Sequence, residues 1–136
     1  MSNRQKFYID GKWVTPSTSE TIDVINPATE QPIDAVAMGG AADVDKAVAA
    51  AKAAFEIFSQ TSKEERIALL EAIIAKYAER MSDIAAVISE EMGAPANLAA
   101  KAQAPTGIGH LMTAVNVLKE FEFEEDMGTT RIIREP

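Results

Sequence analysis

Few residues of this 136-residue chain are of a type and spacing that could do chemistry. His110 is the only histidine, and no carboxylate lies three or four residues away to serve it as a general base or metal ligand on a helix. Glu90 and Glu91 are adjacent, so on a helix their side chains point about 100° apart rather than toward a shared substrate. Cysteine is absent, which excludes disulfides, cysteine nucleophiles and thiolate metal sites within these residues. We therefore predict no catalytic residue in this chain.

One glycine pattern could bind a nucleotide. Gly107-Ile108-Gly109 could begin a dinucleotide fingerprint, but Met112 stands where the third glycine belongs and no parallel-sheet strand precedes it. We interpret the pattern as a helix boundary and predict no cofactor-binding residue. Tyr8 and Trp13 are similarly better explained by packing within a hairpin than by a ligand platform.

The bulk composition limits the class of protein. The length predicts one domain, and 47% hydrophobic with 25% charged residues is ordinary for a folded soluble chain. A net charge of −8 argues against nucleic acid or an anionic membrane surface as the main partner, because both need basic patches. Residues 1–5 are polar, and the alanine-rich run Ala47–Ala54 is too short to span a bilayer. We expect a cytoplasmic protein.

One long stretch, Thr61–Gly93, organises the predicted fold. Ser62 and Glu65 form a capping box at its start, with Thr61 and Glu64 as the alternative register. Its apolar residues recur at alternating steps of three and four, which is one face of an α-helix. They are Ile67, Leu70, Ile74, Tyr77, Met81, Ile84 and Ile88, and Leu69 and Ile73 widen the face. A restart at Ser82 is possible, and Gly93 and Pro95 end the run.

Short strands are predicted before this stretch. Asp10-Gly11 predicts a type I′ turn and a hairpin over residues 7–14. Strands follow at residues 21–25 and 33–38, separated by a turn at Asn26-Pro27 because proline restricts the residue before it to extended conformations.

Helices and a second hairpin complete the prediction. A helix over residues 42–58 carries an apolar stripe of Val44, Ala47, Val48, Ala51, Ala54, Phe55 and Phe58. A helical segment starting near Pro95 is broken at Pro105 and Gly107, and Thr106 caps a new helix. The apolar face of that helix is Ile108, Leu111, Met112, Val115 and Leu118. Residues 121–134 alternate around a turn at Asp126-Met127-Gly128, which predicts an acidic hairpin.

The expected fold is α+β and a single segment, 1–136. It has short strands over 1–40, three to four helices over 41–120 and an oligomerisation-type hairpin over 121–136. Charge on the acidic strand either blocks unwanted edge pairing or marks an assembly strand completed by a partner.

Several motifs occur together in a recognisable order. They are Phe7-Tyr8-Ile9-Asp10-Gly11-Lys12-Trp13, Val24–Thr29, Asp43–Val48 leading to Ala53-Ala54-Phe55, Glu90–Pro95, Gly107–His110 and Gly128–Pro136. Each is weak alone, but in this order and spacing they resemble the N-terminal part of an NAD(P)-dependent aldehyde dehydrogenase. The resemblance covers almost all of this chain but only about the first quarter of a family member. It implies the N-terminal part of an α/β aldehyde dehydrogenase fold.

The resemblance implies a parent enzyme that oxidises an aldehyde to a carboxylic acid with NAD or NADP. In the family, a cysteine thiolate attacks the aldehyde, hydride passes to NAD(P), and a base assists hydrolysis of the thioester. The cysteine, the glutamate base and the nucleotide-binding strands come later in the family's sequence. We therefore expect this chain to be inactive alone and to bind no cofactor itself.

The resemblance also implies partners and one ion site. Family members often hold a monovalent cation near the Asn-Pro turn, which implies ligation by the main-chain carbonyl of Ile25 and by Glu91. The terminal hairpin corresponds to strands that bridge subunits, so we expect self-association as well as contact with the remainder of an aldehyde dehydrogenase chain. The alternative is a stand-alone, non-enzymatic α+β interaction module that binds through its acidic C-terminal hairpin.

Overall fold

The computed structural model describes residues 3–135; Met1, Ser2 and Pro136, the last residue of the motif 128–136, lie outside the described residues. The fold is α+β, as predicted. Its strands are β1 (Phe7–Ile9), β2 (Lys12–Val14), β3 (Thr21–Asn26), β4 (Gln31–Ala37), β5 (Glu124–Met127) and β6 (Thr130–Ile133). Its helices are α1 (Ala41–Phe58), α2 (Lys63–Glu79), α3 (Met81–Met92), α4 (Ala96–Leu98) and α5 (Ala104–Glu120), with a 3₁₀ turn at Asn3–Gln5 and a π-helical turn at Ala99–Gln103.

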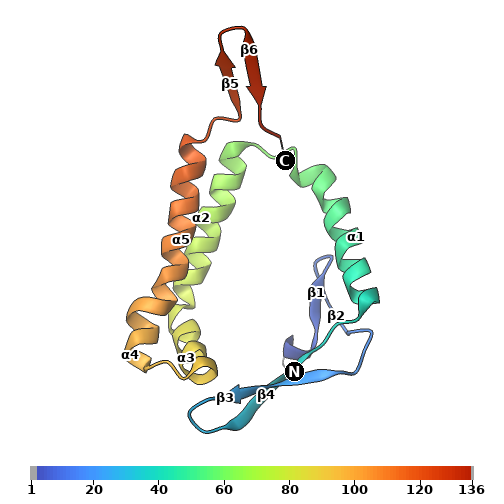
Figure 1. The fold of residues 1–136 in the computed structure, drawn as a ribbon, viewed down its shortest axis with the longest axis vertical. Coiled ribbons are helices and arrows are strands. Elements are labelled where there is room, and N and C mark those ends of the chain that lie inside the picture. Colours follow the sequence, from blue (N-terminus) through green and yellow to red (C-terminus); the bar gives the residue numbers. More distant parts are fainter. Residues whose placement is uncertain (1–2, 136) are drawn as a thin grey trace.

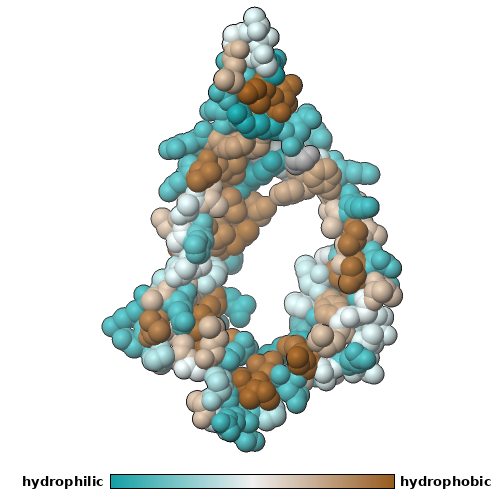
Figure 2. Space-filling view, viewed as in Figure 1, coloured by the Kyte–Doolittle hydropathy of each residue, from teal (hydrophilic) through white to brown (hydrophobic). Residues whose placement is uncertain are grey.

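The elements form an open ring (Figure 1). One arm consists of α2 and α5 side by side, with α3 and α4 at their lower end. The other arm is α1, and the β3–β4 ribbon lies across the base. The β5–β6 hairpin projects at the opposite end of the molecule. Figure 2 shows that side chains do not close the space between the two arms.

The strands pair as three separate antiparallel ribbons: β1 with β2, β3 with β4, and β5 with β6. The first turn is confirmed: Asp10 and Gly11 both have positive φ, 52° and 70°, as a type I′ turn requires. The last turn differs from the prediction, because Met127 pairs with Thr130 and the two turn residues are therefore Gly128 and Thr129. Gly128 supplies the positive φ, 67°, that ends β5.

The predicted long helix is two helices. Arg80 leaves the helical region at φ −108° and ψ 11°, and α3 begins directly after it. The possible restart at Ser82 is therefore placed two residues too late, and Ser82 is no cap. The capping box at the start of α2 is confirmed, because Ser62 N–H donates to Glu65 Oε2 at 2.7 Å and Glu65 N–H donates to Ser62 Oγ at 3.1 Å.

The predicted break at Pro105 and Gly107 is wrong. Pro105 lies in the first turn of α5, directly after the π-helical turn Ala99–Gln103, and Gly107 lies inside the helix. Thr106 is no cap, because its hydroxyl donates back to the carbonyl of Ala102 at 2.8 Å. The preceding π-helical turn, Ala99–Gln103, carries the chain into α5 without a loop.

The core is small and lies on one side of the ring. The buried hydrophobic residues among those described are Ala85, Ala99, Ala104 and Val115, all on α3, α5 and the π-helical turn. The seven residues of the predicted stripe of α2 and α3 are half-buried, whereas Leu69 and Ile73 beside them are exposed. All seven residues of the stripe predicted on α1 are exposed. None of the helices in residues 3–135 has both the length and the apolarity needed to cross a bilayer.

Candidate functional site

Gly107, the first glycine of the pattern on α5, packs against Tyr77 of α2. A Cβ atom built at Gly107 would lie 2.4 Å from Tyr77 Oη and 2.6 Å from Tyr77 Cζ, so the ring of α2 occupies that space. Tyr77 Oη also donates to the carbonyl of Ala104 at 2.9 Å. A phosphate would need the space and the backbone N–H groups that this contact and the helix already use. The space beside Gly107 is therefore occupied, and the two glycines lie inside α5 rather than at the helix boundary predicted from the sequence.

The other candidates for chemistry are dispersed. His110 is exposed on α5, and Glu90 and Glu91 are exposed in the last turn of α3. Within residues 3–135, no group of three or more histidine or acidic side chains is placed to hold a metal ion.

The segments that carry Ile25 and Glu91, the two predicted cation ligands, are packed together. Asn26 Oδ1 accepts the N–H of Ala28 at 2.9 Å, which shapes the turn after β3. This turn lies against the end of α3, because a Cβ at Gly93 would lie 2.8 Å from Pro27 Cγ. Gly93 itself ends α3 with φ 68°, which favours glycine. The structure thus places the two ligand-bearing segments in contact and leaves the ion itself a prediction.

A charged pair lies near the same junction. Arg4 forms an ion pair with Asp34 of β4, and the hydrogen bond from Arg4, together with the Ala35 N–H, lowers the pKa of the Asp34 carboxyl. Asp34 in turn raises the pKa of Arg4, with a smaller contribution from the negative charges of Glu90 and Glu91. The acidic end of α3 therefore already has a positive side chain nearby.

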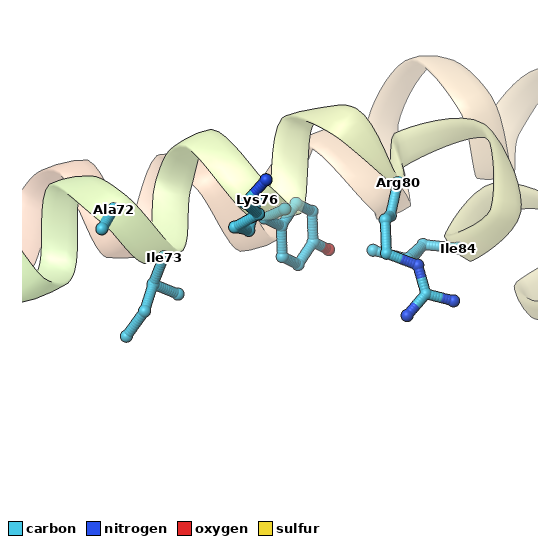
Figure 3. A pocket seen from close by; sticks show the side chains of 6 residues that line it. Ala72, Ile73, Lys76, Arg80 and Ile84 are labelled. Carbon is cyan, nitrogen blue, oxygen red and sulfur yellow. The ribbon is translucent and has the colours of Figure 1, made fainter.

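An apolar groove runs along α2 and into α3 (Figure 3). It has a volume of about 490 Å³ and is lined by Ala72, Ile73, Lys76, Tyr77, Arg80 and Ile84. In Figure 3, Ile73 and Arg80 extend to the same open side of the helices. The two cations at its rim have acidic partners on their own helices, Lys76 with Glu79 at 2.8 Å and Arg80 with Asp83 at 3.6 Å. Because most of the lining is apolar, the groove is best suited to apolar side chains.

The opposite arm carries an exposed apolar stripe. We call Val44, Val48, Phe55 and Phe58 the α1 stripe; their exposed fractions are 59, 48, 50 and 50%. The main packing contact of α1 is with β1 near the start of the helix. A stripe of this kind on an 18-residue helix normally faces a core. The predicted stripe is therefore present but not buried by the described residues.

The start of α1 is anchored by Asp43, a feature that sequence analysis missed. Its carboxylate is 4% exposed and accepts the Ser17 hydroxyl at 2.6 Å, the Ser17 N–H at 3.0 Å and the Gly40 N–H at 3.0 Å. These hydrogen bonds, the one from the Ser17 hydroxyl first, lower the pKa of Asp43. The contact with Ser17 could not be predicted from the sequence, because nothing local indicates a partner 26 positions away.

The base of the terminal hairpin is held by Arg66, which was also missed. Arg66 Nε donates to Thr61 Oγ1 at 2.9 Å and Arg66 Nη2 donates to the carbonyl of Ser59 at 3.0 Å. Its guanidinium lies over the rings of Phe58 and Phe123, 5.9 and 6.0 Å from their centroids. One side chain thus joins the end of α1, the start of α2 and the hairpin.

The sequence is similar to those of known aldehyde dehydrogenases. The family model described as "Aldehyde dehydrogenase family" matches residues 13–136. A 3-succinoylsemialdehyde-pyridine dehydrogenase from a Pseudomonas species is 46% identical over 137 residues, which cover 100% of this chain and 29% of that protein. A putative aldehyde dehydrogenase from Staphylococcus aureus is 44% identical and is covered to 28%.

Solved structures agree in backbone as well as sequence. Aldehyde dehydrogenase C (AldC) of Pseudomonas syringae, a Cys-to-Ala variant in complex with NAD+ and octanal, superposes with a TM-score of 0.95 at 45% identity, covering 98% of this chain and 28% of that one. An aldehyde dehydrogenase of Bartonella henselae gives a TM-score of 0.90 at 42% identity, with 96% and 28% covered. The chain thus spans less than a third of the length of the relatives it matches.

Proposed function

The chain belongs to the aldehyde dehydrogenase family, and on that premise we propose that it is the N-terminal part of an enzyme that oxidises an aldehyde to a carboxylic acid with NAD. The superposition on AldC with a TM-score of 0.95 carries the proposal, because the open arrangement of these elements recurs in a much longer chain solved with NAD+ and octanal. NADP is the alternative cofactor.

In this proposal the 136 residues are scaffold. The reaction needs a thiolate to attack the aldehyde carbon, hydride transfer from the resulting hemithioacetal to the nicotinamide, and water to release the acid from the thioester. These residues include no cysteine, and the Tyr77 side chain occupies the space beside Gly107 of α5. The nucleophile, the base and the cofactor-binding strands would therefore come from other residues of the parent enzyme.

A covalent chimera tests the proposal. The chain replaces the matching N-terminal part of active AldC, and NADH formation is followed with octanal as substrate. We expect a folded chimera that reduces NAD+, with AldC itself as the positive control. A soluble, folded chimera with no activity would count against the proposal, because a scaffold that matches this well should support the same chemistry.

The cation site remains part of this proposal. The carbonyl of Ile25 and the carboxylate of Glu91 would hold sodium or potassium where the turn after β3 meets the end of α3. The test compares the melting temperature of the chimera in sodium chloride and choline chloride at equal ionic strength. Glu91→Gln should abolish a sodium-specific rise, whereas Glu90→Gln, one residue away, should leave it. An equal melting temperature in both salts contradicts the site.

A second function is supported by the terminal hairpin. The β5–β6 ribbon projects from the body of the molecule (Figure 1), and all four residues of β5 are exposed. The projecting ribbon could pair with a strand of a second copy, as the proposed self-association requires, or with another protein if the chain acts as a stand-alone module. Light scattering at micromolar concentration tests the first case, and a monomeric mass would contradict it.

A further inference from the structure

The first turn of the described chain, Asn3–Gln5, lies against β4 at the base of the ring (Figure 1). Arg4 of this turn forms an ion pair with Asp34 of β4. The Asp34 carboxylate is itself held in place, because its Oδ1 accepts the N–H of Ala35 at 2.7 Å. Asp34 therefore determines where the positive charge of Arg4 lies.

That position is at the edge of the predicted cation site. In the β3–β4 ladder Asp34 pairs with Val24, the residue directly before Ile25. The turn that follows β3 contacts Gly93, two residues after Glu91, at the end of α3. The ion pair of Arg4 thus lies on the same ribbon as one predicted ligand and beside the helix end that carries the other.

The charges at this junction interact. The Asp34 carboxylate contributes most to the raised pKa of Arg4, and the negative charges of Glu90 and Glu91 add to it. Arg4 therefore lies close enough to the acidic end of α3 to be influenced by both of its carboxylates. The influence is mutual, because the same attraction favours the ionised form of each carboxylate.

The backbone at Ile25 is also suited to an ion. A register shift between Val24 and Ile25 places Pro32 opposite Ile25 in the ladder. Proline has no N–H, so Pro32 cannot donate a ladder hydrogen bond to the carbonyl of Ile25. Backbone carbonyl oxygens are ligands that a monovalent cation accepts in place of its water. The irregular pairing thus fits the ligand role predicted for this carbonyl.

We propose that Arg4 acts as an internal cation at this site and competes with sodium or potassium for the acidic end of α3. The inference rests on the proposed cation site and goes beyond it, because Arg4 precedes residues 13–136, which the family model matches. A fixed positive charge reduces the electrostatic gain from bringing a second one nearby. Arg4 therefore weakens ion binding, and it stabilises the junction when no ion is bound.

The sodium dependence of the melting temperature of the AldC chimera tests this inference. Sodium chloride replaces choline chloride at constant ionic strength, so that only the ion-specific stabilisation is measured. Arg4→Gln should lower the sodium concentration that gives half of the maximal rise by about three-fold, the size expected for a partly exposed charge interaction. Lys6→Gln is the matched control, because it removes the same charge two residues away. Arg4→Lys, which keeps the charge, should retain the midpoint of the unmodified chimera.

A second comparison does not depend on the midpoint. In choline chloride alone, Arg4→Gln should melt at a lower temperature than Lys6→Gln, and added sodium should reduce the difference. With Glu91→Gln present, Arg4→Gln should no longer change the response to sodium, because the carboxylate for which the two cations compete is gone.

Equal sodium midpoints for Arg4→Gln and Lys6→Gln would overturn the inference and leave the cation site intact. A higher midpoint for Arg4→Gln would also overturn it, by showing that Arg4 supports ion binding. Absence of a sodium-specific rise in every variant would overturn the cation site and this inference together. The proposed oxidation of aldehydes is tested separately by the activity of the chimera with octanal, since the melting measurements need only folded protein.

Discussion

The contact between Tyr77 and Gly107 predicts opposite effects for two similar glycine substitutions. Gly107 and Gly109 are both inside α5, and alanine has the higher helix propensity at either position by about 1 kcal/mol. A Cβ at Gly109 meets nothing within 4 Å, so Gly109→Ala should stabilise the chain by up to about 1 kcal/mol. The same atom at Gly107 lies 2.4, 2.6 and 2.9 Å from three atoms of the Tyr77 side chain.

Those three distances are far inside van der Waals contact, so the tyrosine ring or the whole of α5 must shift. Overpacking of this kind costs about 1–3 kcal/mol. Displacement of Tyr77 also breaks its hydrogen bond to the Ala104 carbonyl, worth about 1 kcal/mol. After subtraction of the propensity gain, Gly107→Ala should destabilise the chain by about 1–3 kcal/mol, and the two variants should differ by about 2–4 kcal/mol.

Urea unfolding followed by far-UV circular dichroism measures both variants against the unmodified chain. The double variant Tyr77→Ala/Gly107→Ala should show a favourable coupling, because removal of the ring makes room for the methyl group. If Gly107→Ala were as stable as Gly109→Ala, α2 and α5 would not meet at this glycine and the reasoning would be refuted.

Three other substitutions test the anchors of the scaffold. Because the pKa of Asp43 is lowered in the folded chain, its carboxylate stabilises the fold above the ordinary aspartate pKa and loses this effect as pH falls through the lowered value. Asp43→Asn should therefore be less stable than the unmodified chain at neutral pH. When the pH is lowered below about 4, the urea midpoint of Asp43→Asn should fall less than that of the unmodified chain. Ser62→Ala removes the acceptor for the Glu65 N–H and should cost about 1 kcal/mol in urea unfolding, whereas Ser82→Ala, which removes no cap, should cost less. Arg66→Lys loses the two-ring contact and the forked donor, so the β5–β6 amides should exchange faster while helix content is unchanged; unchanged exchange would contradict this account.

Local patterns predicted most of the elements. The Asp10-Gly11 turn, the capping box at Ser62 and the stripe of α2 depend on residues within about eight positions of one another, and the structure has all three. The break at Pro105 was predicted wrongly because proline usually interrupts a helix, whereas here a π-helical turn precedes it and the chain stays helical on both sides.

The features of the site that sequence analysis missed all join distant segments. Asp43 meets Ser17 across 26 positions, and Tyr77 meets Ala104 across 27. Arg66 reaches Phe123, 57 positions later at the base of the terminal hairpin, through a ring contact rather than an ion pair. None of these residue types is unusual at its position, so without a fold there is no signal that marks it. The family resemblance was predictable because it depends on the order of short motifs, and the family model confirms it.

The difference between the predicted and the observed burial has a physical meaning. An apolar stripe at helical spacing is selected in the environment where the protein works, whereas the burial observed here reflects only these 136 residues. The two agree on α2, where Ile74 and its neighbours are half-buried beside α5, and disagree on α1, where Phe55 remains half exposed. A helix that kept a continuous stripe without a partner would gain nothing from it and would risk aggregation. The exposed stripe of α1 therefore indicates a contact that these 136 residues do not supply.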